Sequence, residues 1–216
     1  MKNNMLNIAI FMFLSLMTHI FYGNFIISYK QGGTYLYDSS GEEIKCLSSF
    51  IKADKIKWSK DRSHSIVSFE PGAVCLYDFN GNEIKCISHL TKAQKIKWAP
   101  DGKSFLIFYP LWGVYLYDIN GNEIQHISAS TADKIKWSCD SKAFVIYYSS
   151  IKYVLTPGIY LYDCKGKEIN RISYNRVEKI KSIDDGFVIS YIDGGVDFIK
   201  KEKRTLANIH SADYIE

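Results

Sequence analysis

Polar and apolar residues alternate in short runs, and the same runs return roughly every forty residues along the chain. In the third copy, residues 95–98 alternate as one half-buried strand would, and a turn rich in Pro, Asp and Gly follows at 99–103. Residues 104–109 are continuously apolar and aromatic, which is typical of a strand buried on both faces. Two further strands are predicted at 114–118 and 123–128, joined by an Asn-Gly hairpin signal.

Two short phrases mark the copies. Lys-Ile-Lys-Trp occupies 55–58, 95–98 and 134–137 and weakens to Lys-Ile-Lys-Ser at 179–182, while Leu-Tyr-Asp occupies 36–38, 76–78, 116–118 and 161–163. A period near forty with four short antiparallel strands in each unit is what a propeller blade requires. The pattern therefore predicts an all-β protein, a small β-propeller of about five four-stranded blades.

The third copy also resembles a known repeat. Trp98-Ala99-Pro100-Asp101-Gly102-Lys103, and later Val114-Tyr115-Leu116-Tyr117-Asp118-Ile119-Asn120-Gly121, are similar to the repeat of TolB-type, WD-repeat-like β-propellers. The likeness runs from Phe25 to the C-terminus and is partial in the second and fourth copies, which keep the Asp and lose the Pro and Gly. The resemblance implies a propeller that binds partners more often than it catalyses, and it implies no active site.

The first copy lacks a first strand, and the end of the chain offers one. Residues 212–216 repeat the start of the phrase at 53–57, so they are expected to pair with the N-terminal blade and close the ring. The alternative is an open arc that completes itself by oligomerising. The expected blades are 25–50 plus the tail, 52–90, 92–130, 131–174 and 177–210.

The N-terminus predicts a separate segment. Residues 5–22 are mostly apolar behind a weakly positive lead, so 1–23 are expected to be a signal peptide or an N-terminal anchor, and 24–216 the propeller domain. A buried first strand is the third possibility for this stretch. Export to the periplasm or outside the cell is expected, with membrane anchoring by the N-terminus as the alternative.

Composition excludes several functions. The chain is 47% hydrophobic and 15% aromatic, enough for a globular core, and its net charge of +4 is too small for a dedicated nucleic-acid binder. The five cysteines form no Cys-x-x-Cys pair and stand beside no histidine at a zinc-ligand spacing, so neither metal nor cofactor is expected. The repeated Asp-x-x-Gly turns lack the spacing of a calcium loop and are expected to be structural.

The candidate binding residues fall into two groups. Trp112 and Leu111 stand in a loop that departs from the repeat, where an exposed aromatic can anchor a partner. Lys57, Lys97 and Lys136 are expected near the channel axis, where they would form a basic mouth for an anionic ligand or simply extend to water.

The expected function is that of a non-enzymatic, monomeric propeller that binds a protein partner through one face. A lectin-like propeller that binds carbohydrate or an anion is the alternative, and a glycoside-cleaving enzyme rests on fold analogy alone. Because the loops differ between copies, a single protein partner is favoured over repeated sugar sites. Function is expected where the copies disagree, at Trp112 and the insertion at 151–157.

Overall fold

The computed structural model describes residues 23–88, 90–130, 132–149, 157–173, 175–200 and 203–207. These residues form strands and turns, and no helix among them is long and apolar enough to cross a membrane. The strands are β1 Phe25–Ser28, β2 Thr34–Tyr37, β3 Glu43–Ser48, β4 Ala53–Trp58, β5 His64–Phe69, β6 Val74–Asp78, β7 Glu83–Ser88, β8 Lys95–Trp98, β9 Ser104–Tyr109, β10 Gly113–Asp118, β11 Glu123–Ser128, β12 Lys134–Trp137, β13 Ala143–Tyr148, β14 Gly158–Asp163, β15 Glu168–Ser173, β16 Val177–Ile183, β17 Gly186–Tyr191, β18 Val196–Lys200 and β19 Lys203–Ala207.

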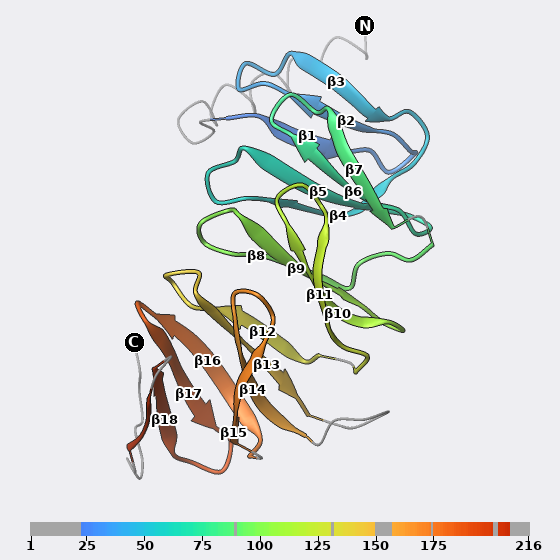
Figure 1. The fold of residues 1–216 in the computed structure, drawn as a ribbon. Coiled ribbons are helices and arrows are strands. Elements are labelled where there is room, and N and C mark those ends of the chain that lie inside the picture. Colours follow the sequence, from blue (N-terminus) through green and yellow to red (C-terminus); the bar gives the residue numbers. More distant parts are fainter. Residues whose placement is uncertain are drawn as a thin grey trace, which may run out of the picture.

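The strands form five antiparallel sheets, each built from consecutive strands. Sheet 1 is β1-β2-β3, sheet 2 is β4 to β7, sheet 3 is β8 to β11, sheet 4 is β12 to β15 and sheet 5 is β16 to β19. Figure 1 shows the sheets following one another in an arc, with sheet 1 at the top of the view and sheet 5 at the bottom. The first strands of sheets 2 to 5 contact one another in turn along the arc. The all-β, propeller-like architecture expected from the repeat is confirmed.

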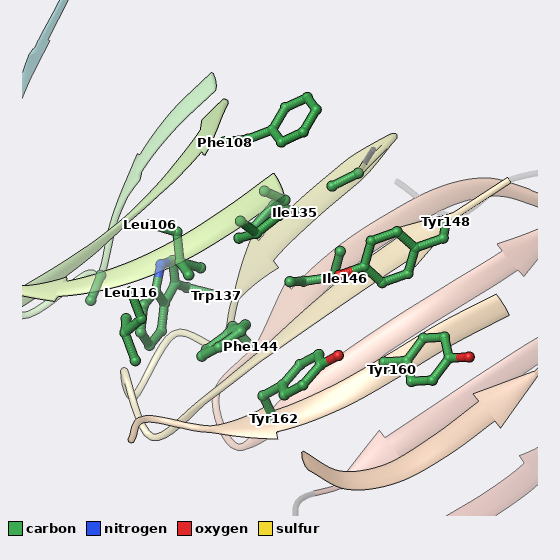
Figure 2. Packing of buried hydrophobic residues seen from close by; sticks show 13 residues of the cluster. Leu106, Phe108, Leu116, Ile135, Trp137, Phe144, Ile146, Tyr148, Tyr160 and Tyr162 are labelled. Carbon is green, nitrogen blue, oxygen red and sulfur yellow. The ribbon is translucent and has the colours of Figure 1, made fainter. Parts of the chain in front are cut away.

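The core lies between neighbouring sheets. Between sheets 3 and 4 the ring of Phe144 stacks on Tyr162 at 5.2 Å and tilts against Trp137 at 4.8 Å, and both contacts are visible in Figure 2. Leu106 and Leu116 of sheet 3 cover these rings from the other side. One period earlier Trp98, Phe105 and Tyr117 make the same aromatic ladder, so the repeated residues explain the packing of one sheet on the next.

The tryptophan of the Lys-Ile-Lys-Trp phrase also links sheets by hydrogen bonds. The indole nitrogen of Trp98 donates to the carbonyl oxygen of Lys57 at 3.0 Å, and that of Trp137 donates to the carbonyl oxygen of Lys97 at 3.2 Å. Each tryptophan therefore satisfies a carbonyl group on the first strand of the preceding sheet, as a buried indole requires. Trp98 and Trp137 therefore contribute to the packing of neighbouring sheets.

The Asp-x-x-Gly turns are structural, as predicted. In the hairpin between β10 and β11, one carboxylate oxygen of Asp118 accepts hydrogen bonds from the backbone amides of Asn120 at 2.9 Å and Asn122 at 2.7 Å. The amide of Gly121 donates to the carbonyl oxygen of Asp118 at 3.0 Å and holds a positive φ of 75°, which glycine adopts without strain. The turns at Asp38, Asp78 and Asp163 repeat this arrangement.

The expected ring closure is not found among the described residues. Sheets 1 and 5 lie at opposite ends of the arc, and among the described residues sheet 1 has three strands, with β1 paired to β2 alone. Residues 212–216, which were expected to fill that edge, lie outside the described residues, as do 1–22 of the expected leader and 151–156 of the expected insertion. Figure 1 shows the two ends of the arc apart, so sheets 1 and 5 do not pack on each other.

Candidate functional site

Strand directions divide the molecule into two faces. The strands β1, β2 and β3 of sheet 1 correspond to the second, third and fourth strands of the other sheets. With this numbering, one face carries the turn between the second and third strands of each sheet together with the segment that joins each sheet to the next. We call it the connection face; between sheets 1 and 4 it includes residues 29–33, 49–52, 70–73, 90–94, 110–112 and 129–133, of which 131 is not described. The opposite face, which we call the hairpin face, carries the turns between first and second strands and between third and fourth strands.

Large apolar side chains project from the connection face. Phe50 is 88% exposed, Leu90 79% and Leu111 82%, values reached by no other exposed large apolar residue of the described chain. Trp112 and Ile51 are exposed by 41% and 42%. Phe50 follows the last strand of sheet 1, Leu90 follows the last strand of sheet 2, and Leu111 lies in a turn of sheet 3. These exposed apolar side chains are therefore spread along the arc over three successive sheets. We call these three residues with Trp112 the apolar row.

The backbone beneath the row is tightly fixed. A Cβ atom on Gly32 would lie 2.7 Å from the carbonyl oxygen of Phe50, and one on Gly72 would lie 2.9 Å from the backbone of Leu90. In sheets 1 and 2 the second-to-third turn therefore lies directly against the segment that leads to the next sheet. The hydroxyl of Thr34 donates to the carbonyl oxygen of Ile51 at 3.0 Å and holds this segment on sheet 1.

Trp112 is held through its main chain while its ring stays accessible. Its carbonyl oxygen lies 3.1 Å from the Nε2 atom of His126, and the imidazole of His126 stacks on Tyr115 at 4.2 Å. The indole ring tilts against Tyr109 with ring centres 6.1 Å apart. A side chain that is fixed on one edge and open on the other loses little conformational entropy when a partner covers it. Trp112 and Leu111 thus lie where the sequence predicted, in an exposed loop.

Phe50 and Leu90 were not expected as binding residues. Both lie in segments that look like plain connections, between a fourth strand and the next first strand. A sequence signal was available, because each follows the serine that ends its fourth strand, Ser48 or Ser88, by two residues. An apolar residue that recurs at the same position of a polar connecting segment lies outside the hydrophobic core, so it indicates a binding role at the surface.

The predicted lysines lie on the other face. Lys97 and Lys136, with Lys181, line an open hollow of about 480 Å³ beside Trp98 and Trp137. Partial burial, together with repulsion from the ammonium groups of Lys136 and Lys57, lowers the pKa of Lys97. The ammonium groups of Lys57 and Lys136 are therefore close enough to act on that of Lys97, and an anion beside Lys97 and Lys136 in the hollow would relieve part of this repulsion.

The first lysine of the phrases at 95–98 and 134–137 has a structural role. The ammonium group of Lys95 donates to the carbonyl oxygens of Ala132, at 3.0 Å, and Asp133, and that of Lys134 donates to the carbonyl oxygens of Val177, at 3.1 Å, and Glu178. These two lysines tie sheets 3 and 4 to the start of the first strand of the following sheet, whereas Lys55 of sheet 2 forms an ion pair with Asp54. The two lysines of a Lys-Ile-Lys-Trp phrase thus point to opposite ends of their strand.

The two groups of predicted site residues do not form one site. Lys97 pairs with Leu106 and Trp98 with Phe105, next to the turn at 99–103, whereas Leu111 and Trp112 follow the other end of β9. The apolar row and the basic hollow therefore belong to opposite faces. The described residues contain no group of three or more His, Cys, Asp or Glu side chains placed to hold a metal ion.

The fold and its repeated aromatic ladders define a WD-repeat-like β-propeller. Residues 26–180 match the sequence model of the family described as eukaryotic translation initiation factor eIF2A, and the chain belongs to that family. No curated protein matches the chain in sequence. The narrower likeness to TolB-type repeats stays a prediction.

Solved structures share the fold at low identity. The C-terminal WD40 domain of Sif2 is 15% identical, with a TM-score of 0.58, over 89% of this chain and 60% of that one. A chain of a mitotic checkpoint complex is 14% identical, with a TM-score of 0.55, over 87% and 61%. The computationally designed protein Ika8 is 15% identical, with a TM-score of 0.56, over 84% and 57%. The chain thus spans about three fifths of each similar chain.

Proposed function

We propose that this chain is a non-enzymatic scaffold that binds a protein partner through the connection face. The observation that carries the proposal is the apolar row, whose three most exposed members come from three successive sheets. Soluble proteins seldom place several large apolar side chains together on one face unless a partner covers them. The fold supports the same function, because propellers present loops from a rigid platform.

The chemistry of the row favours a protein over a carbohydrate. Phe50, Leu90 and Leu111 are two aliphatic residues and one aromatic, and only Trp112 has the broad flat ring that suits the face of a sugar. A lectin that gains avidity from repeated sites would carry the same residue in each sheet. An extended apolar surface that contains two aromatic residues, Phe50 and Trp112, matches the centre of a protein interface.

A second candidate is anion binding at the basic hollow. Partial burial, together with repulsion from Lys136 and Lys57, lowers the pKa of Lys97, so the charge of Lys97 is unfavourably placed. A phosphate or carboxylate seated there would be stabilised by the ammonium groups of Lys97, Lys136 and Lys181, which line the hollow. The two candidates use opposite faces, so one set of variants separates them.

The test is affinity capture with the full chain as bait, from extracts of its own host. A variant that combines Phe50→Ser, Leu90→Ser and Leu111→Ser should capture the protein that wild type binds at least about tenfold more weakly, because each substitution removes a large apolar contact. The matched control combines Ile84→Ser, Ile124→Ser and Ile169→Ser, which are 38%, 40% and 42% exposed on fourth strands away from the row. That control should capture the partner as wild type does.

A third variant, Lys57→Ala with Lys97→Ala and Lys136→Ala, tests the hollow in the same experiment. If this lysine variant captures the partner as well as wild type does, the result supports binding at the connection face. If the lysine variant loses the partner while the apolar-row variant still captures it, the proposal is overturned in favour of the basic hollow. All variants are first compared with wild type by circular dichroism, so that binding is measured on folded protein.

The compartment decides which partners are available. We propose, from residues 1–23 alone, that the chain is exported, whereas the description of its family refers to translation initiation. Fractionation of host cells before capture distinguishes the two. Recovery of the bait with exported proteins is expected, and recovery with ribosomes and RNA would contradict both export and the expectation that no nucleic acid is bound.

A further inference from the structure

One position on the third and fourth strands recurs in sheets 1 to 4 and brings two side chains together. In sheet 3 it places Tyr115 opposite His126, and their rings stack at 4.2 Å. In sheet 4 it places Tyr160 opposite Arg171, whose guanidinium carbon lies 5.1 Å from the ring centre. The strand register shifts directly before this pair in all four sheets. The position is therefore one where side chains of neighbouring strands touch.

Sheet 2 carries a cysteine on both strands at this position. Cys75 of β6 lies opposite Cys86 of β7, and their two sulfur atoms are 2.8 Å apart. A disulfide bond is about 2.05 Å long, so the sulfur atoms lie within about 1 Å of bonding distance. The repeat thus places two thiols where sheets 3 and 4 place a ring and its cross-strand partner.

The backbone also meets the requirements of a disulfide. Residues directly opposite each other in an antiparallel pair have Cα atoms about 4.5–5.5 Å apart, inside the span of about 4.4–6.8 Å that disulfides bridge. The strands pair on both sides of the two cysteines, with Val74 opposite Ser88 and Leu76 opposite Lys85. Closing the bond therefore requires movement of the sulfur atoms rather than of the strands.

The remaining cysteines provide a comparison within the same chain. Cys46 of sheet 1 lies opposite Tyr35, so one strand alone carries a thiol there. Cys139 and Cys164 lie in turns, and all three of these cysteines are exposed. In the strand pairing of the described residues, Cys75 and Cys86 are the one pair of cysteines placed opposite each other.

The two thiols of the pair differ in their access to solvent. Cys75 is 5% exposed and lies in a hydrophobic cluster with Val67 and Tyr77, whereas Cys86 is partly exposed on β7, the outermost strand of the sheet. Burial, followed by the hydrogen bond and the charge of Cys86, raises the pKa of Cys75. Cys86 is therefore the sulfur that a reagent from solution reaches first.

We propose that Cys75 and Cys86 are a redox-active pair that closes to a disulfide by exchange with a small-molecule disulfide such as oxidised glutathione. The Cys86 thiolate attacks one sulfur of the reagent, whose S–S bond breaks, and one glutathione leaves as a thiolate. Cys75 then loses its proton and attacks the Cys86 sulfur, which releases the second glutathione. Two protein thiols are oxidised, one glutathione disulfide is reduced, and the two protons end on the two glutathiones. The proposal is independent of the partner on the connection face.

The bond would lock the strand from which the Leu90 segment leaves. Cys86 lies two residues before Ser88, the end of β7. The hydroxyl oxygen of Ser88 accepts hydrogen bonds from the backbone amides of Leu90 and Thr91, each at 3.4 Å. The disulfide would therefore join the third strand of sheet 2 to the strand that carries this connection.

Trypsin separates the two cysteines, because Lys85 lies between them. Cleavage after Arg62, Lys85 and Lys92 places Cys75 in peptide 63–85 and Cys86 in peptide 86–92. The folded full chain is incubated with oxidised glutathione, the remaining thiols are blocked with N-ethylmaleimide, and the digest is measured by mass spectrometry without reduction. Peptides 63–85 and 86–92 should be linked to each other at least about tenfold more often than any other pair of cysteine peptides.

Single substitutions serve as controls, after circular dichroism has shown that each variant is folded. Cys139→Ser should leave the linked peptides unchanged, whereas Cys75→Ser should leave glutathione on Cys86, because the second thiol that displaces it is gone. The proposal is overturned if wild type keeps both Cys75 and Cys86 as thiols, or if it retains glutathione on Cys86. It is also overturned if Cys86 links to Cys46 as often as to Cys75.

Discussion

Replacement of Phe144 by Ala is expected to lower the free energy of unfolding by about 3–5 kcal/mol. The side chain is fully buried between sheets 3 and 4, where it stacks on Tyr162 and tilts against Trp137. Its removal would leave a void between two sheets that are held in place by their neighbours, so the structure cannot collapse around it. Urea denaturation at fixed protein concentration measures the loss.

Phe79→Ala is the matched control. Phe79 is 43% exposed in the turn between β6 and β7, and its carbonyl oxygen, which accepts a hydrogen bond from Asn24, survives the substitution. This variant should lose less than about 1 kcal/mol. Equal losses for Phe144→Ala and Phe79→Ala would mean that the aromatic ladders do not hold the sheets together.

Gly113→Ala should cost about 3 kcal/mol or more, because two penalties act at once. Gly113 has a positive φ of 86°, and a Cβ atom there would lie 1.7 Å from the carbonyl oxygen of Ser128. Backbone atoms cannot give way as a flexible side chain can, so the turn that holds Trp112 would have to move. Thermal and urea denaturation report the loss.

Gly41→Ala separates the two penalties. Gly41 has a similar φ of 91°, but nothing lies within 4 Å of the added Cβ, so only backbone strain remains. A loss of about 1 kcal/mol is expected for this variant. If both variants lose the same amount, the close approach between the turn and the segment at Ser128 does not constrain the connection face.

The repeat predicted most of the fold because it records local contacts. The alternation at 95–98 and the Asn-Gly at 120–121 specify strands and a hairpin within a single sheet, and the structure confirms both. Ring closure depends instead on the angle between neighbouring sheets summed over the arc. No local pattern fixes that angle, so the sequence could not distinguish a closed ring from open ends.

The binding residues were predicted less completely for a related reason. Trp112 stood out because it departs from the repeat, whereas Phe50 and Leu90 sit at the same repeat position and looked like part of it. The lysines looked equivalent in sequence, yet Lys95 holds the next sheet while Lys97 faces the hollow. Which end of a strand a side chain reaches depends on its neighbours in three dimensions.

The most direct test of the scaffold proposal is site-specific photo-crosslinking in the native host. A photoreactive phenylalanine analogue is placed at Phe50, Leu90 or Leu111 on the connection face, and at Phe79 on the hairpin face as the control. The account predicts adducts to the same protein from the first three positions and none from position 79. Adducts from position 79 alone, or from none of the four positions, would contradict it.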